Sequence, residues 1–570
     1  MFAHPAEVAL ARAEWQSVLF ADRPSRFELA KLKPTWPTSP LKIRVHRNHS
    51  FEHIADAANA WFAWQGLKPE FQYSDYDDSL SFASVNESAA NLELVWLDLS
   101  HYTAKFGPAE LANWLENRVT ALRALSKAPI LVAALGADGA LHDQLADFTR
   151  KLPGTRLADL RPTSAKLGSA FLDERAARFS GTRLSDRACV LIAREFACRW
   201  APSLLYPRLK AVILDLDHTL YSGVLGEDGV QVKLTPAHGD LQKYLAKLRD
   251  DGLFLTLVSR NEEADVKELF EQRTDFPLRW EHFSAKAIGW GNKAEGIRKV
   301  ASALRIGLDA VLYVDDNPGE LASVVSELPM ISTAHAMEDA SSTCRMLEYY
   351  PKLWAWERSA TDALRASDLE SQAERDRLAA QMTNPMEYLR SLQVKIRIEV
   401  TPHAHLARLH ELSQKTNQFN LNLMRYSEVA LAEALDAQDY RVAVVELADR
   451  MSNSGQIALI VAQKEKDALT VHEVAVSCRA LGRNLEDFII AETIRAILDE
   501  LPAAEVRISH RTAARNNPAR EWLARFSATQ LAPEGQTVVT NQIKSHSQEN
   551  FPVTLEVVKN EQHGIETASR

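Results

Sequence analysis

The stretch AVILDLDHTLYSGVLGEDG (residues 211–229) decides the fold of the middle of this chain. Its four leading apolar residues predict a buried strand of a parallel sheet, and Asp215 and Asp217 follow where that strand ends. Open α/β sheets bind their ligands at the carboxyl ends of the strands. Two carboxylates in one crevice repel each other, so a cation between them is expected, and Mg²⁺ suits such oxygen ligands.

Two further apolar runs repeat this arrangement along the chain. The run FLTLV leads into Ser259, and the run AVLYV leads into Asp315 and Asp316. Between them, Lys293 lies at the start of a predicted helix, where its ammonium would neutralise a phosphoryl group. These residue types suit phosphoryl transfer, in which the first aspartate attacks and the second serves as acid and base.

The order DLDHT, LVSRN, GWGNK, YVDDNP resembles the haloacid dehalogenase superfamily, and within it the subfamily of FkbH-like proteins. The resemblance implies that Asp215 is the nucleophile and that Asp217 is the acid/base, which also binds Mg²⁺ through its backbone. The other implied roles are phosphate contact or geometry for Thr219 and Ser259, charge neutralisation for Lys293, and metal ligation for Asp215, Asp315 and Asp316. A capping or turn role is an equal alternative for Thr219 and Asp316.

Between the first and second of these strands the chain has room for a small flap and one helix, but not for a cap domain. In the flap, Tyr221, Ser222 and Gly223 stand where the subfamily usually has Trp-Gly-Gly. An open site suits a large or carrier-tethered substrate. The resemblance implies transfer of a glyceryl unit from 1,3-bisphosphoglycerate to the phosphopantetheine thiol of an acyl carrier protein, in polyketide or nonribosomal biosynthesis. The subfamily often has a cysteine before the second-motif serine, where this chain has Val258.

The C-terminal part resembles the acetyltransferase-like (GNAT-like) half of FkbH-like proteins, through QKTNQFNLNLMRY (residues 414–426), ELADRMSNSGQIALI and VSCRALGRNLED. In such folds the turn 479–484 can offer backbone N–H groups at a helix N-terminus to a pantetheine pyrophosphate. RALGRN lacks the usual final glycine or alanine. The candidate pantetheine-binding residues are Asn417, Asn420, Cys478, Arg479 and Gly482. For the asparagines a turn role, and for the cysteine a buried structural role, are alternatives.

Basic residues in these C-terminal motifs suggest a docking surface. Lys415, Arg425, Arg479 and Arg483 are expected to form a basic face for an acidic carrier protein. Such a face would offset the repulsion from the formal net charge of -10.

The chain has 570 residues, so about three or four domains are expected. Alternating apolar runs and helical patterns predict an α/β multidomain fold with a central parallel sheet. A mainly antiparallel mixed pattern follows near the C-terminus. The expected parts are an N-terminal helix and linker (1–40), an α/β domain (41–205), the phosphoryl-transfer domain (206–341), a helical connector (342–393), the GNAT-like domain (394–558) and a disordered tail (559–570).

The first α/β domain carries a weaker motif. HRNHSFEHI follows the strand LKIRV and superficially resembles the serine block of the SGNH hydrolases. Ser50 has no nearby glycine of the oxyanion type, and no convincing Asp-x-x-His follows near the end of the domain. A degenerate SGNH-like domain with a structural or docking role is therefore expected.

Composition narrows the class of protein. The net charge of -10 and the pI near 6.0 argue against nucleic acid as the main partner. Four separate cysteines without a CxxC pair argue against a zinc site or a disulfide framework. Without a basic leader or a long apolar run, a cytoplasmic protein away from membranes is expected. The oligomeric state stays open, and two other functions remain: a stand-alone phosphatase of a small metabolite, and an inert scaffold that docks carrier proteins.

Overall fold

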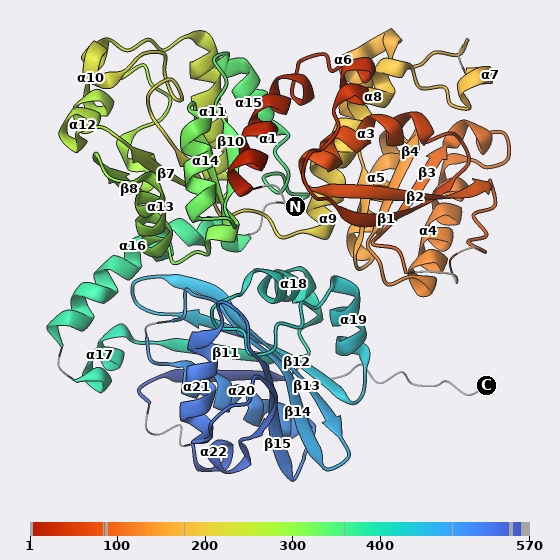
Figure 1. Cartoon of the computed structure of the whole chain (residues 1–570). Coiled ribbons are helices and arrows are strands. Elements are labelled where there is room, and N and C mark those ends of the chain that lie inside the picture. The colour runs from red at the N-terminus through yellow and green to blue at the C-terminus, as the bar shows by residue number, and fades with distance from the viewer. Residues whose placement is uncertain are drawn as a thin grey trace, which may run out of the picture. The chain divides into compact units, whose positions relative to one another are not determined.

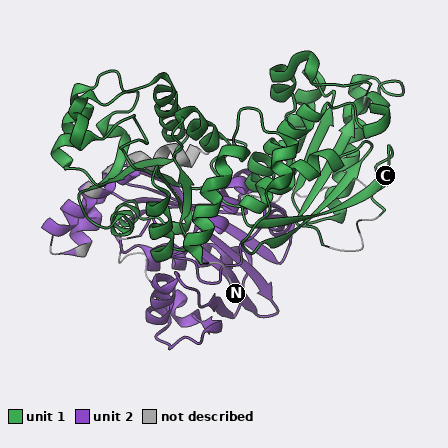
Figure 2. Cartoon of the chain, turned by 45° about the horizontal axis from the view of Figure 1, so that its top comes forward, with its two compact units in different colours: residues 1–358 green, residues 359–570 purple. Residues whose placement is uncertain are grey.

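The computed structural model describes residues 4–83, 85, 89–175, 177–357, 360–382, 384–481, 483–546 and 551–559. The chain divides into two compact units, Met1–Arg358 and Ser359–Arg570 (Figure 2). The first unit contains two parallel sheets, and the second contains one mixed sheet (Figure 1). The predicted α/β multidomain fold is therefore confirmed. In the predicted tail, residues 560–570 lie outside the described residues.

The N-terminal segment forms two helices, α1 (Pro5–Leu19) and α2 (Arg26–Lys31), where one helix followed by a linker was expected within residues 1–40. Pro24 disfavours helical backbone at the residue before it, which accounts for the break. The proline-rich stretch at residues 33–40, expected to be a linker, packs against the rest of the first unit through Trp36. Its Trp36 is buried, lies 4.7 Å from the Trp15 ring between centroids, and donates a hydrogen bond to the Ala63 carbonyl at 2.9 Å.

The first sheet has the strand order β2-β1-β3-β4-β5, and all its strands are parallel. Ser50 follows the first strand, and its hydroxyl donates to Glu52 Oε2 at 2.6 Å. The strands are β1 (Ser39–Arg47), β2 (Leu67–Tyr76), β3 (Leu92–Asp98), β4 (Ile130–Leu135) and β5 (Thr155–Ala158). The helices are α3 (Glu52–Trp64), α4 (Pro108–Leu125), α5 (Gly139–Lys151), α6 (Arg161–Leu167), α7 (Ala177–Ser180), α8 (Asp186–Glu195) and α9 (Ala201–Leu205).

The second sheet has the strand order β10-β9-β6-β7-β8, again all parallel. Between β6 and β7 lie only the short helix α10, a 3-10 turn and α11, so the expectation of a small flap without a cap domain is confirmed. The strands are β6 (Ala211–Leu214), β7 (Phe254–Ser259), β8 (Phe283–Ile288), β9 (Val311–Asp315) and β10 (Ser332–His335). The helices are α10 (Leu225–Asp228), α11 (Pro236–Asp250), α12 (Glu263–Gln272), α13 (Lys293–Ala303), α14 (Pro318–Glu327) and α15 (Ala340–Glu348).

The helical connector expected over residues 342–393 is shared between the two units. Helix α15 belongs to the first unit, whereas α16 (Ala360–Gln381) and α17 (Pro385–Leu392) belong to the second. Arg375 of α16 is fully buried, and its Nε donates to Asp449 at 2.8 Å. This buried ion pair fixes α16 to the mixed sheet of its own unit.

The mixed sheet has the order β16-β15-β14-β13-β12-β11-β17. Four of its six strand pairs are antiparallel, which confirms the mainly antiparallel pattern predicted for this part. The strands are β11 (Lys395–Val400), β12 (Tyr440–Ala448), β13 (Asn453–Glu465), β14 (Ala468–Val476), β15 (Glu505–Arg511), β16 (Glu534–Val538) and β17 (Thr554–Lys559). The remaining helices are α18 (Leu406–Lys415), α19 (Glu428–Asp436), α20 (Glu486–Glu500), α21 (Asn517–Ser527) and α22 (Thr540–Ser545).

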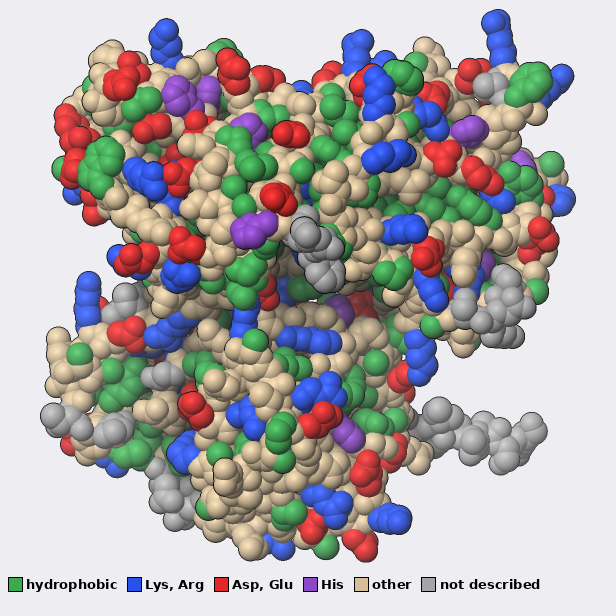
Figure 3. Space-filling view, viewed as in Figure 1, with side chains coloured by type: hydrophobic (Ala, Val, Ile, Leu, Met, Phe, Trp, Pro, Cys, Tyr) green, Lys and Arg blue, Asp and Glu red, His purple; other side chains and the backbone are tan. Residues whose placement is uncertain are grey.

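The charges on the surface and the apolar character of the described helices agree with the amino-acid composition. On the face that Figure 3 shows, Lys and Arg side chains are interspersed with Asp and Glu in both units. Among the described residues, no helix combines the length and the apolar character that a bilayer crossing needs.

Candidate active site

Three neighbouring strands of the second sheet bring the predicted acidic residues together. Strand β6 lies between β7 and β9, and the Asp215 amide donates to the Val314 carbonyl at 3.0 Å. Asp215 therefore follows β6 beside Asp315, the last residue of β9, while Ser259 ends β7 on the other side. Since parallel strands end at the same edge, buried apolar runs have delivered all three polar side chains to one place.

Lys293 is the first residue of α13, and its position depends on close helix packing. The side chain of Asn292 caps the helix by accepting from the Ala294 amide at 2.7 Å. Farther along, a Cβ on Gly296 would lie 3.0 Å from Val258 Cγ1, so the lack of a side chain at Gly296 favours close packing of α13 on β7. The Lys293 ammonium lies 3.2 Å from Asp215 Oδ2 and 2.5 Å from Asp315 Oδ2.

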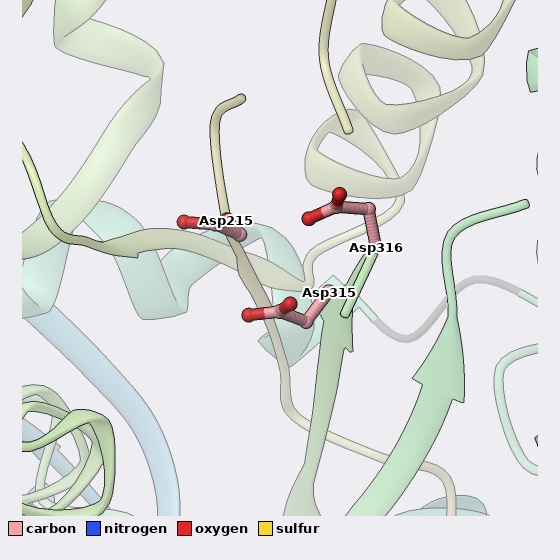
Figure 4. A group of neighbouring side chains, drawn as sticks. All are labelled: Asp215, Asp315 and Asp316. Atoms are coloured by element: carbon pink, nitrogen blue, oxygen red, sulfur yellow. The ribbon is translucent and has the colours of Figure 1, made fainter. Parts of the chain in front are cut away.

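The carboxyl groups of Asp215, Asp315 and Asp316 form a cluster in which the candidate ligand atoms all lie within 4.8 Å of one another (Figure 4). Asp215 Oδ1 is buried and has no hydrogen-bond partner among the described residues. The three clustered carboxyl groups, of which those of Asp215 and Asp315 are buried, form the kind of oxygen donor set that suits a hard divalent cation. These three residues would hold the predicted Mg²⁺.

Burial and charge act on the acids and on the lysine in opposite directions. Burial, together with the neighbouring Asp315, raises the pKa of Asp215 to about 6, although the positive charge of Lys293 acts the other way. Burial and the Asp315 charge also raise the pKa of Asp316. For Lys293, burial alone would lower the pKa, but Asp215 and Asp315 more than offset it and raise the pKa above its ordinary value.

The raised pKa of Asp215 predicts a pH dependence of stability in the metal-free protein. The folded pKa of about 6 exceeds the ordinary 3.8, so the folded state binds this proton more tightly than the unfolded state. The resulting stabilisation is present below about pH 4 and is lost as pH rises through about 6. In EDTA, the Tm of wild type relative to Asp215→Asn should therefore fall from pH 4.5 to pH 7 by differential scanning calorimetry. An unchanged Tm difference would contradict it.

Asp217 is held by the flap and by Asn261, just after β7, and it does not join the carboxylate cluster. Its Oδ1 accepts from the Tyr221 hydroxyl at 2.7 Å and from the Leu225 amide at 2.9 Å, and its Oδ2 accepts from Asn261 Nδ2 at 3.0 Å. These contacts fix the carboxyl group two residues beyond the proposed nucleophile. The Thr219 hydroxyl oxygen is buried and has no hydrogen-bond partner among the described residues, as a phosphate contact would require.

Two residues of the site were not nominated from the sequence. Asn261 donates to both Asp217 and Ser259, the latter at 3.1 Å, and so ties the two motifs together. Tyr313 is fully buried, and its hydroxyl donates to Asp315 Oδ2. The sequence could have indicated both residues, because Asn261 lies two residues after Ser259 and Tyr313 lies two residues before Asp315. In a strand, residues two apart share a face, so Tyr313 and Asp315 are on the same side of β9.

In the second unit, the predicted pantetheine residues are engaged with their own chain. Asn420 is fully buried, accepts from the Leu423 amide at 2.7 Å and donates to the Thr416 carbonyl at 3.4 Å. Asn417 Oδ1 accepts from Arg425. Cys478 and Arg479 are half-buried just beyond β14, and Gly482 lies outside the described residues.

A chain segment also fills the space between two diverging strands of this unit. Strands β14 and β15 pair only as far as Val471 and Ile508. Beyond that point the Leu421 amide donates to the β14 residue Val474 at 3.1 Å, and the Leu421 carbonyl accepts from the β15 residue Arg511 at 2.9 Å. Residues 419–421 thus form backbone hydrogen bonds with both strands in this gap.

Of the four cationic residues expected to form a basic face, Arg483 does not reach the surface. Arg483 is fully buried, where its Nη2 donates to Ser454 at 2.9 Å and lies 3.4 Å from Asp449. Lys415 donates to Glu411 at 2.6 Å, and Arg425 donates to the Ser413 carbonyl at 2.6 Å. These cationic groups have partners within the chain, because a buried charge without a partner destabilises the fold strongly.

Asn420→Ala should destabilise the second unit by about 1–3 kcal/mol, because it removes the acceptor of the Leu423 amide and one of the two side-chain donors to the Thr416 carbonyl, the other being Arg425. The measurement is the urea midpoint, followed by hydrogen exchange of β14 in the whole chain. Asn541→Ala on the exposed surface of α22 is the matched control and should leave the midpoint unchanged. Equal midpoints for both variants would show that the Asn420 bonds contribute nothing.

Comparison with protein-family models gives no match, and comparison with curated sequences gives none either. Among solved structures, the N-terminal part of the protein BF1531 from Bacteroides fragilis, which contains a phosphatase domain and was crystallised with Mg, aligns over 59% of this chain and 97% of its own, with 19% identity and a TM-score of 0.42. Mutant forms of the spermidine/spermine N-acetyltransferase SpeG from Vibrio cholerae align over 27% of this chain and 97% of their own, with 12% identity and a TM-score of 0.19. A functional conclusion comes instead from the side chains of the site.

Proposed function

We propose that this chain catalyses Mg²⁺-dependent phosphoryl transfer through Asp215. The observation that carries the proposal is the arrangement of this carboxylate, which has one oxygen 3.2 Å from the Lys293 ammonium and the other buried without a partner. The first oxygen is held by charge, and the second is available for attack. When bound, Mg²⁺ supplies positive charge that lets the clustered acids and a phosphate group coexist.

The reaction then has two steps, transfer of the phosphoryl group to Asp215 and hydrolysis of the phosphorylated Asp215. Asp215 Oδ1 forms a bond to phosphorus as the bond to the leaving oxygen breaks, and Asp217 gives that oxygen a proton. In the second step Asp217 takes a proton from water, whose oxygen attacks phosphorus and frees Asp215 and phosphate. Lys293 neutralises charge on the phosphoryl oxygens throughout.

The finer proposal is that the product is a glyceryl, or related acyl, unit on an acyl carrier protein. An acyl phosphate such as 1,3-bisphosphoglycerate passes its acyl group to the phosphopantetheine thiol with loss of one phosphate. Hydrolysis of the remaining phosphate ester at Asp215 releases the second. The site without a cap domain supports a tethered acceptor, as does the resemblance of four motifs to FkbH-like proteins.

Intact-protein mass spectrometry tests this finer proposal. A holo carrier protein incubated with enzyme, Mg²⁺ and 1,3-bisphosphoglycerate should gain the mass of a glyceryl unit, while phosphate appears in solution. The apo carrier, which lacks the thiol, is the control and should gain nothing. Phosphate release without a mass gain on any pathway carrier would contradict acyl transfer and leave phosphatase activity.

A stand-alone phosphatase is the second candidate, and two observations favour it. The residue before Ser259 is Val258, a buried apolar side chain that cannot carry a thioester. In the second unit, residues 419–421 occupy the gap between β14 and β15. A phosphate-release screen over small phosphorylated metabolites, without any carrier, separates the two. Loss of Mg²⁺-dependent turnover in Asp217→Asn would exclude the inert scaffold.

A further inference from the structure

Trp290 is unusual among the tryptophans of this chain because its side chain faces solvent. The chain has twelve tryptophans, all in the described part, and the other eleven are buried or half-buried. Trp290 is 73% exposed. An exposed indole does not contribute the free energy of folding that its burial would provide. Its exposure therefore favours a role in binding over a role in folding.

The indole lies at the rim of the candidate active site. The amide of the preceding Gly289 donates to the Ser259 carbonyl at 3.0 Å, which places this loop beside the end of β7. Three residues farther on, Lys293 contacts Asp215 and Asp315. Trp290 is therefore bracketed in the chain by two contacts with the site.

The ring is fixed, and the loop around it is open. Its Nε1 donates to Glu262 Oε1 at 2.6 Å, and Glu262 follows Asn261, which binds Asp217. A Cβ added to Gly289 or Gly291 would meet no atom within 4 Å. One edge of the indole is thus held by a hydrogen bond, while most of the side chain faces solvent.

We propose that Trp290 is a specificity-determining residue that packs against the organic part of the substrate whose phosphoryl group lies at Asp215. This inference rests on the proposed function. The class of substrate is a phosphate ester whose organic part extends beyond the phosphoryl group far enough to cover the exposed indole. Aromatic and apolar contacts of this kind contribute through buried area and stacking on the ring, and they act on substrates of that class alone.

Steady-state kinetics with two substrates tests the inference. p-Nitrophenyl phosphate has a flat leaving group, whereas acetyl phosphate has a small one. Trp290→Ala should raise the ratio of the KM for p-nitrophenyl phosphate to the KM for acetyl phosphate about tenfold, with kcat for p-nitrophenyl phosphate preserved, because the lost contact stabilises ground state and transition state alike. Trp290→Phe should restore most of the ratio.

Two controls separate recognition from a structural role. Phe179→Ala removes another exposed ring, on α7, and should leave both KM values unchanged. Glu262→Ala breaks the hydrogen bond to Nε1 but keeps the ring, so it should change the KM ratio less than Trp290→Ala does. If Glu262→Ala and Trp290→Phe both reproduce the Trp290→Ala effect, or if Trp290→Ala leaves the ratio unchanged, the inference is wrong. A wild-type enzyme that turns over neither substrate removes the proposed function together with it.

Discussion

Asp215→Asn is expected to lower kcat for phosphate release by about 10⁴-fold or more, the scale on which enzymes lose activity when their nucleophile is removed. The amide keeps the size of the side chain but is a far weaker nucleophile than a carboxylate. It also removes one of the three carboxylates within 4.8 Å of one another, so Mg²⁺ affinity should fall as well. The measurement is phosphate release with and without Mg²⁺, at saturating substrate.

The matched control for this variant is Asp250→Asn, near the end of α11, where the side chain is 63% exposed. It should retain wild-type kcat. Asp217→Asn gives a second arm, because loss of the acid/base should slow hydrolysis of the covalent intermediate. Intact mass after mixing with substrate should then show added phosphate in that variant and none in Asp215→Asn. Wild-type activity in Asp215→Asn would exclude this carboxylate as the nucleophile.

Much of the central fold and site could be predicted because the sequence marks where each strand ends. Apolar runs that end in Asp215, Ser259 and Asp315 predict buried parallel strands, and parallel strands share an edge. Lys293 was predicted from the start of a helix. The break between α1 and α2 at Pro24 was not predicted, and neither was the packing of Trp36 on Trp15.

The rest could not be predicted because it depends on contacts between distant segments. Arg483 has the sequence context of an exposed loop, yet buried partners such as Asp449 neutralise it. Residues 419–421 fill the gap between two strands through backbone hydrogen bonds, which side-chain patterns do not encode. Asn261 and Tyr313 were not predicted for the same reason, because their contacts with Asp217 and Asp315 form only in the folded chain.

Lys293→Met is expected to lower the free energy of unfolding in EDTA by about 3–5 kcal/mol, the usual cost of leaving a buried charge without its partner. The lysine side chain is 6% exposed and contacts both Asp215 and Asp315. Methionine fills a similar volume, so the loss reports charge more than packing. The measurement is the Tm of wild type and variant in EDTA, by calorimetry.

Mg²⁺ should return part of this stability, because a cation bound by the same carboxylates replaces some of the missing positive charge and binds only the folded state. The rise in Tm between EDTA and saturating Mg²⁺ should therefore be larger in Lys293→Met than in wild type. Lys299→Met is the matched control, since Lys299 lies on the same helix, is 69% exposed and pairs with Glu295 at 3.0 Å. Its Tm should stay close to wild type in both buffers. If Lys293→Met were as stable as Lys299→Met in EDTA, the two aspartates would not be charged in the folded protein, and an ionised Asp215 nucleophile would lose its electrostatic basis.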